Sequence, residues 1–275
     1  MRVIMRYFKR KFKAILTSFV NSFSKINIPL TINNYKILRL KNKYMGKRCF
    51  IIGNGPSLKP QDLEKLKNEF TFASNKIYKI FNRTNWRPTF YMVVDPVVMG
   101  ENLTDINLVE AGKKFTLKGY KNMFTTADIF FNNNLYKDKR GTFSTNIMET
   151  LYSSGTVSFS MLQIAFYMGF SEVYLIGHDY NFKGAVSKTK DLSSLKNDTN
   201  TQIYFTKDYV RSDEKKAGQA PAEMYSGMEK AKLAYEGSGR KIYNATRVTY
   251  LDVFDIKNFD DILGDTNDKL HQNIN

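Results

Sequence analysis

The sequence predicts an α/β fold: a Rossmann-like, mostly parallel sheet with helices on both faces, plus a lid segment and an N-terminal amphipathic helix. Three observations predict it. Short apolar segments typical of strands alternate with helix-like segments, several strand segments end in Gly, Ser, Asn or Asp, and a long polar stretch interrupts the second half. With 275 residues, 42% of them hydrophobic, the chain can bury one main core with appendages.

The chain divides into three parts. Residues 1–45 are expected to form a basic amphipathic helix and a connector, residues 46–263 the Rossmann-like domain, and residues 264–275 a polar tail. Within the domain, residues 183–222 are polar and lack strong periodicity. A stretch of that length inside a compact domain is usually a lid or a disordered segment.

The N-terminal segment is basic and amphipathic. Six basic residues occur by Lys13, no acid occurs in the first 30 positions, and apolar residues recur near helical spacing at Ile4, Phe8, Phe12, Ile15, Phe19 and Phe23. The segment lacks the run of about 18 apolar residues that a spanning helix needs. We expect a helix on an anionic membrane face, with the protein cytoplasmic and peripheral at the inner membrane. The alternative is packing on its own domain or on another subunit, which leaves a homo-oligomer open.

The first half of the domain contains the clearest strand signals. Residues 24–47 are polar and basic and read as a connector, and residues 62–70 have helical character. Strands are expected at 48–52, 70–73 and 89–94, with weaker ones around Phe115 and Phe124.

The second half begins with a helix at 156–168. Val157, Met161, Ile164 and Met168 share one face of it, and Gly169 follows as a cap. A strand at 172–176, a helix at 222–235 and a last strand at 241–243 complete the alternation.

Composition narrows the function classes. The net charge of +16 favours an anionic partner: a nucleotide, a phospholipid surface or a nucleic acid. Zinc-finger spacing and RNP-type motifs are missing, so we do not expect nucleic acid; a basic surface without a specific partner is the alternative. Cys49 is the single cysteine, and His178 and His271 are the two histidines, so neither a disulfide nor a zinc cluster is expected.

Turn residues at strand ends are expected to share one crevice, because ligands of such sheets bind beyond the carboxyl ends of the strands. The turn Gly53, Asn54, Gly55, Pro56 and Ser57 matches neither a Walker A loop nor GxGxxG. It is expected to bring backbone N–H groups close to a phosphate, with a purely structural turn as the alternative.

The start of the 156–168 helix is a second candidate. Ser153, Ser154, Gly155 and Thr156 offer hydroxyls and N–H groups that suit a phosphate or a carboxylate. An ordinary Ser/Thr N-cap is the alternative.

Ionisable residues at strand ends are the catalytic candidates. Asp95 is expected to bind a ribose hydroxyl or a sugar, or to cap its turn, and His178 beside Asp179 is a candidate general base. A hydrogen-bonded structural histidine is the rival interpretation. Glu223 and Tyr225 are further candidates for general-base or phosphate contacts.

The order of these motifs resembles two related bacterial groups. IIGNGPSL at 51–58, SN at 74–75, SG at 154–155 and GFSEVYLIGHDYNF at 169–182 are similar to the lipo-oligosaccharide sialyltransferases. VDP at 94–96 and KIYNAT at 241–246 are similar to the family of motility-accessory-factor glycosyltransferases and 6-hydroxymethylpterin pyrophosphokinase-like proteins. The resemblance covers roughly residues 46–263.

This resemblance implies a glycosyltransferase with a Rossmann-like fold. The implied donor is a CMP-activated nine-carbon acid sugar, and the implied acceptor is a surface glycan or lipid-linked glycan. Asn54, Asn75, Ser154 and Gly155 match the positions that contact the nucleotide and the donor. The implied catalysis inverts configuration and needs no metal or other cofactor, in keeping with the lack of an Asp-x-Asp motif after a strand.

One departure keeps two other functions open. The sialyltransferases use a histidine after the flexible lid, where this chain reads APAEMYSGMEK, so His178 or Glu223 would have to supply the base. The first alternative is a pterin pyrophosphokinase, although acidic pairs such as Asp260 and Asp261 are poorly placed for its magnesium. The second is a non-catalytic nucleotide-binding module.

Overall fold

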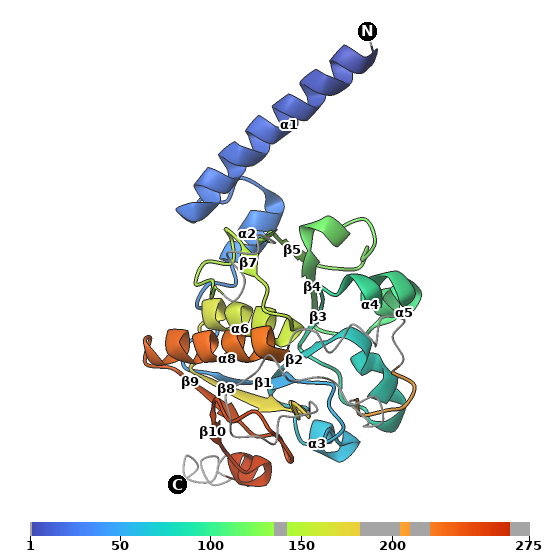
Figure 1. Cartoon of the computed structure of the whole chain (residues 1–275), viewed down its shortest axis with the longest axis vertical. Helices are drawn as coiled ribbons and strands as arrows, with labels where there is room; N and C mark the ends of the chain where they lie inside the picture. Colours follow the sequence, from blue (N-terminus) through green and yellow to red (C-terminus); the bar gives the residue numbers. More distant parts are fainter. Residues whose placement is uncertain (1, 135–141, 182–203, 210–220, 265–275) are drawn as a thin grey trace, which may run out of the picture.

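A parallel eight-stranded sheet forms the centre of the molecule (Figure 1), in the order β10-β9-β8-β1-β2-β3-β4-β5. The computed structural model describes residues 2–134, 142–181, 204–209 and 221–264. The chain runs outward from β1 to β5 and then returns to place β8 on the other side of β1. This reversal makes the junction of β1 and β8 the topological switch point of the sheet.

Nineteen elements are described. They are α1 (Arg2–Lys25), α2 (Ile32–Leu38), β1 (Arg48–Ile52), α3 (Pro60–Glu64), β2 (Phe70–Ser74), the 3₁₀ segment η1 (Asn75–Arg83), β3 (Phe90–Val93), α4 (Pro96–Glu101), α5 (Leu103–Leu108), β4 (Lys113–Leu117), η2 (Lys118–Tyr120), β5 (Ile129–Phe131), β6 (Asn133–Asn134), β7 (Leu151–Tyr152), α6 (Val157–Met168), β8 (Glu172–Ile176), α8 (Pro221–Glu236), β9 (Lys241–Asn244) and β10 (Asp255–Ile256). Strands β6 and β7 form a separate two-stranded parallel pair.

Alternate side chains of the strands pack into two hydrophobic cores, one on each face of the sheet. In β1, Cys49 and Ile51 face the core that contains α6 and α8, whereas Phe50 and Ile52 face the core under α3, η1, α4 and α5. Because both faces of a parallel sheet are covered, its strands are apolar on both sides. This burial accounts for the continuous apolar run CFII at 49–52.

Helix α6 is the most buried helix of the described residues. Eleven of its twelve residues are buried, so it shows no polar stripe and packs across the sheet. The Thr156 hydroxyl caps it by accepting from the Ser158 N–H, and Gly169 ends it at φ 91°. Tyr235 of α8 donates to the carbonyl of Leu162 at 2.8 Å and so ties α8 alongside α6.

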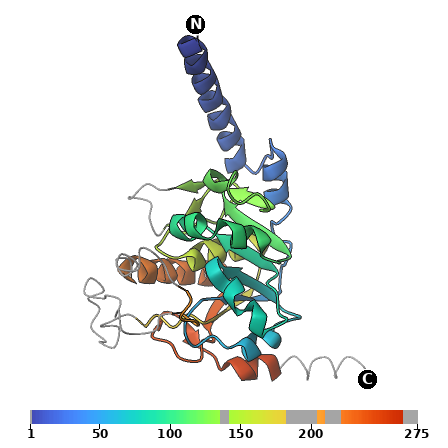
Figure 2. The same cartoon turned by 90° about the vertical axis from the view of Figure 1, so that its right-hand side faces the viewer.

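Helices α1 and α2 extend the molecule beyond β5 (Figures 1 and 2). The side chain of Asn33 bonds both the carbonyl and the N–H of Phe130, at 2.7 and 2.9 Å, and so covers the edge strand β5. Asn146 donates to the carbonyl of Ser24 at 3.2 Å, which holds the end of α1. The rest of α1 projects away from the sheet, and no helix among the described residues is long and apolar enough to cross a membrane.

The fold class and most strand positions expected from the sequence agree with the structure, whereas three of the expected segments differ from it. The connector at 24–47 contains helix α2, because Thr31 caps it and Asn33 holds it on β5. The helix expected at 62–70 is the single turn α3, after which turns lead into β2.

The third difference concerns the weaker strands. No strand forms around Phe124, whose ring is instead buried edge-on against Tyr91, and the edge strand of the main sheet is β5. Most of the expected lid at 183–222 and of the tail at 264–275 lies outside the described residues; from the lid only residues 204–209, 221 and 222 are described.

Candidate functional site

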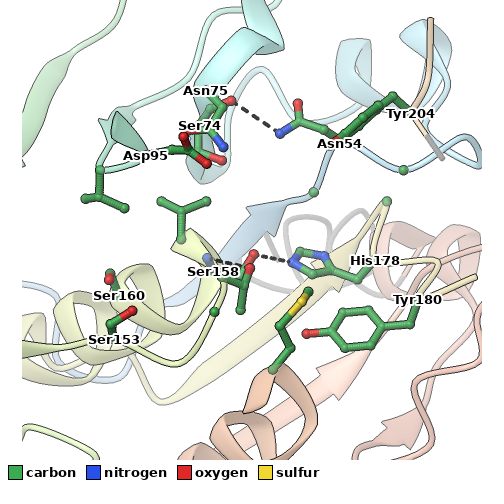
Figure 3. Close-up of a pocket in the computed structure, with 18 of the residues that line it drawn as sticks. Asn54, Ser74, Asn75, Asp95, Ser153, Ser158, Ser160, His178, Tyr180 and Tyr204 are labelled. Atoms are coloured by element: carbon green, nitrogen blue, oxygen red, sulfur yellow. Dashed lines mark hydrogen bonds between the residues drawn. The ribbon is translucent and has the colours of Figure 1, made fainter. Parts of the chain in front are cut away.

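A cavity of about 630 Å³ opens at the carboxyl ends of β8, β1, β2 and β3. It lies at the switch point of the sheet, where ligands of open α/β sheets bind, and its volume is typical of small-molecule sites. Its polar wall (Figure 3) comes from four strand ends, the start of α6 and the segment 204–209. The predicted residues on this wall are Gly53, Asn54, Gly55, Pro56, Asn75, Asp95, Ser153, Gly155, Thr156, His178 and Asp179.

The glycines at 53 and 55 allow two strand ends to touch. A Cβ on Gly53 would lie 2.2 Å from the carbonyl oxygen of Gly177, and a Cβ on Gly55 would lie 1.9 Å from a carboxylate oxygen of Asp179. The N–H of Gly53 donates to Ile176 at 2.8 Å, and that of Gly55 donates to Gly177 at 2.9 Å. The neighbouring turn therefore uses both of these N–H groups, and a phosphate contact by the rest of the glycine turn stays a prediction.

Asp179 clamps the same two turns. Its carboxylate accepts from the N–H and from the hydroxyl of Ser57, both at 2.9 Å. Burial raises the pKa of Asp179, and the two hydrogen bonds from Ser57 oppose that effect. Ser57 thus lies behind the cavity wall as a structural partner, while Asp179 reaches the cavity.

Two asparagines present carbonyl oxygens without a protein partner among the described residues. The Nδ2 of Asn54 faces the carbonyl of Ser74 at 3.4 Å, which leaves its Oδ1 buried and unbonded, and the Oδ1 of Asn75 is likewise unbonded. Asn75 has a left-handed backbone with φ 52°, held in place by the hydroxyl of Tyr91 on its carbonyl at 2.5 Å. Strained residues and unsatisfied polar atoms mark places where a ligand with N–H or O–H groups can bind.

His178 is buried and bonded at both ring nitrogens. Its Nδ1 lies 3.0 Å from the carbonyl of Ile176, and its Nε2 lies 2.9 Å from the hydroxyl of Ser158. Burial lowers the pKa of His178 to about 4, so the ring is neutral at pH 7. The geometry matches the structural histidine better than a general base, because Nε2 already accepts the Ser158 hydrogen.

Aromatic side chains close the side of the cavity next to the glycine turn. Tyr204 and Tyr209 stack with ring centres 3.9 Å apart, and the N–H of Phe205 donates to the carbonyl of Asn54 at 3.0 Å. Tyr120, Tyr152 and Tyr180 add further hydroxyl-bearing rings to the wall. Such rings suit the flat face of a base or the apolar face of a sugar.

The charge of the described wall is negative. Asp95 and Asp179 line the cavity, and none of its described lining residues is a lysine or an arginine. The Oδ1 of Asp95 accepts from the N–H groups of Val97 and Val98, at 2.9 and 3.1 Å, and so caps α4. No group of three His, Cys, Asp or Glu residues within the described ranges is placed to hold a metal ion.

Three predicted residues join Ser57 outside the wall. Ser154 is fully buried, and its hydroxyl donates to the backbone carbonyl of Glu223 at 2.5 Å. The wall at α8 is formed by Met224 instead of Glu223, and Tyr225 packs its ring edge-on to Tyr180 at 6.5 Å. The roles proposed for these residues in binding or catalysis stay predictions.

Several wall residues escaped prediction. Ser158 lies inside an apolar helix pattern, and Tyr204 and Tyr209 lie in a polar stretch that gave no periodic signal. Tyr180 directly follows His178 and Asp179 at the end of a strand. This position is a sequence signal that could have predicted it as a wall residue.

The sequence was compared with protein families and with curated proteins. The family described as 6-hydroxymethylpterin diphosphokinase MptE-like matches residues 25–185. No curated protein matches the sequence.

Two solved structures are similar to this chain, and the first of them shares its fold. The MAf glycosyltransferase from Magnetospirillum magneticum AMB-1 superposes with a TM-score of 0.51 and 14% identity, over 90% of this chain and 42% of that one. The sialyltransferase CstII from Campylobacter jejuni, in complex with the substrate analogue cytidine-5'-monophosphate, gives a TM-score of 0.47 and 17% identity, over 78% of this chain and 86% of that one.

Replacing Gly55 by Ala should destabilise the protein by about 1–3 kcal/mol, because the new Cβ would overlap the Asp179 carboxylate. The control is Gly119→Ala, where a Cβ meets nothing within 4 Å. Urea unfolding at pH 7 measures the difference. Equal midpoints for the two variants would show that the turns do not need to touch.

His178 should make stability depend on pH. Its pKa is about 4 in the folded protein against 6.5 ordinarily, so the unfolded chain binds the extra proton between these values. The stabilisation of the folded state by the neutral ring is therefore fully present above pH 6.5. As the pH falls towards 4, the free energy of unfolding should drop by roughly 3 kcal/mol.

The pH dependence of the unfolding free energy tests this. His178→Gln should flatten the loss between pH 6.5 and 4, whereas replacing His271, the other histidine, by Gln should not. A wild-type slope that survives His178→Gln would assign the pH dependence to other groups.

Proposed function

The chain belongs to the 6-hydroxymethylpterin diphosphokinase MptE-like family, and we propose that within this family it is a glycosyltransferase acting on a nucleotide-activated sugar. The proposed donor is a CMP-activated nonulosonic acid of the sialic type, and the acceptor is a surface glycan or glycolipid. The observation that carries the proposal is the cavity at the β1–β8 junction, where the separate motif residues Asn54, Asn75, Gly155 and Asp179 meet.

The chemistry of the wall suits a sugar nucleotide. The unbonded Oδ1 atoms of Asn54 and Asn75 and the carboxylates can accept hydrogen bonds from sugar hydroxyls or a cytosine amino group. The start of α6, with Gly155 and Thr156 in the wall, supplies N–H groups and the positive end of a helix dipole for the phosphate. The tyrosine rings offer stacking surfaces.

In the proposed reaction the acceptor hydroxyl oxygen attacks the anomeric carbon of the donor. The bond from that carbon to the phosphate oxygen breaks, and CMP leaves with the electron pair. The acceptor proton passes to a base, and Asp95 and Asp179 are the carboxylates among the described lining residues. Inversion at the anomeric carbon follows from a single displacement.

A lipid-linked acceptor accounts for helix α1. Its exposed apolar residues include Phe12 and Ile15, 70% and 68% exposed, and Leu16 and Phe19 extend the same surface. Arg6, Lys9, Arg10, Lys11 and Lys13 flank these residues, and the helix carries no acid. A second copy would bring like charges together, whereas an anionic membrane neutralises them.

A pterin diphosphokinase is the second candidate, favoured by the description of the family. It would transfer diphosphate from ATP and release AMP. Incubating the protein with CMP-sugars, with and without EDTA, and separately with ATP, magnesium and 6-hydroxymethylpterin distinguishes the two. CMP release that EDTA leaves intact supports the glycosyltransferase; chelator-sensitive AMP release supports the kinase; neither, with tight CMP binding, indicates a binding module.

Removing an asparagine oxygen should weaken nucleotide binding. Asn54→Ala, or Asn75→Gly, which tolerates the left-handed backbone, should raise the Kd for CMP roughly 3- to 10-fold through the loss of a hydrogen bond. Isothermal titration calorimetry measures the effect, with exposed Asn85→Ala as the control. Unchanged affinity in both variants would place the nucleotide elsewhere.

The full chain should sediment with vesicles containing phosphatidylglycerol and not with pure phosphatidylcholine vesicles. Phe12→Glu or Ile15→Glu should reduce the bound fraction about tenfold, whereas Leu108→Glu, at a leucine of α5 that is 73% exposed, should not. A stable dimer in light scattering that Phe12→Glu dissociates would identify α1 as a subunit contact instead.

A further inference from the structure

The wall contains a serine and a histidine that form a pair. Ser158 is the second residue of α6, and His178 follows β8; their side chains lie side by side (Figure 3). Their side chains meet at 2.9 Å between Oγ and Nε2, and both residues are buried, at 5% exposure each. Both also line the cavity.

The partner of the other ring nitrogen determines which hydrogens are present. The carbonyl of Ile176 can only accept, so the Nδ1 of His178, 3.0 Å away, must carry the hydrogen. A neutral imidazole then has a bare Nε2, which accepts from the hydroxyl of Ser158. The hydrogen of that hydroxyl therefore points at Nε2, and only the lone pairs of Oγ remain for a ligand.

The backbone around His178 holds this arrangement. Its N–H donates to the hydroxyl of Thr246 at 3.1 Å, and its carbonyl accepts from the hydroxyl of Thr249 at 2.8 Å. Gly53 leaves room for the ring, since a Cβ there would lie 3.0 Å from Nδ1. The imidazole cannot flip its hydrogen to Nε2 without breaking the bond to Ile176.

A serine near the start of a helix normally donates to an anion. In this structure the Ser158 hydroxyl is not oriented to donate to an anion. Turning its hydrogen towards a ligand would leave the buried Nε2 of His178 without a donor. A phosphate or carboxylate oxygen placed at Oγ would meet lone pairs and be repelled. A hydroxyl or amino hydrogen of the ligand would be accepted.

We propose that Ser158 is a substrate-binding residue that His178 holds as a hydrogen-bond acceptor, and that it receives an O–H or N–H group of the CMP-sugar instead of its anionic groups. His178 is then a positioning residue, and Asn54 and Asn75 are further acceptors on the cavity wall. The identity of the ligand rests on the proposed function, whereas the orientation of the pair does not.

Imidazole ¹⁵N NMR on the full chain tests the orientation without a ligand. The sequence has two histidines, so His178→Gln assigns the signals. At pH 7 we expect His178 with hydrogen on Nδ1 and a hydrogen-bonded Nε2, and Ser158→Ala should move the Nε2 signal towards that of an unbonded nitrogen. Hydrogen on Nε2, or an Nε2 signal that ignores Ser158→Ala, would overturn the proposal.

Binding tests the ligand contact. The Kd values for CMP and for CMP-N-acetylneuraminate are measured for wild type, Ser158→Ala, Ser158→Thr and the control Ser238→Ala, an exposed serine after α8. Ser158→Ala should weaken at least one ligand roughly 3- to 10-fold. Ser158→Thr, which keeps the hydroxyl, should retain most of the affinity, and thermal melting checks that each variant folds.

The outcomes separate the two proposals. If wild type binds and Ser158→Ala binds both ligands equally well, Ser158 does not receive the ligand and the inference fails. If wild type binds neither ligand, the proposed donor fails and the ligand contact fails with it, while the NMR result still decides whether Ser158 is an acceptor.

Discussion

The contact between the turns after β1 and β8 is the constraint on which the site depends. Two glycines bring the turns together, their N–H groups bond the opposing carbonyls, and Asp179 closes the contact by accepting twice from Ser57. Because β1 and β8 lie side by side only where the strand order reverses, this contact also defines the floor of the cavity.

The same contact gives the cavity its chemical character. The N–H groups of Gly53 and Gly55 are bonded inside the protein, and the acceptors on the wall are the Oδ1 atoms of Asn54 and Asn75, two carboxylates and the hydroxyl of Ser158. Donors come from the start of α6 and from tyrosine hydroxyls. A ligand with many hydroxyls and few anionic groups fits this distribution better than a ligand with several phosphates, which favours a sugar nucleotide over a triphosphate.

Helix α1 and the cavity are linked through one edge of the sheet. Asn33 of α2 covers β5, Asn146 holds the end of α1, and the neighbouring pair β6–β7 contributes Asn133, Leu151 and Tyr152 to the cavity wall. A helix lying on a membrane would therefore set the distance of that side of the cavity from the lipid surface. This arrangement is the physical basis for proposing an acceptor that remains bound to lipid.

Local patterns determined the alternation of strands and helices, the cap of α6 and the position of most strand ends, because apolar periodicity and turn residues act over a few neighbouring positions. The sequence alone therefore placed Asn54, Asn75, Asp95 and Asp179 at one edge of the sheet. Tertiary structure decided what those residues do: that glycine donors bond another turn, and that His178 is buried against Ser158. Both depend on partners more than 15 positions away, and hydrogen-bond partners at such separations are set only when the sheet brings the strand ends together.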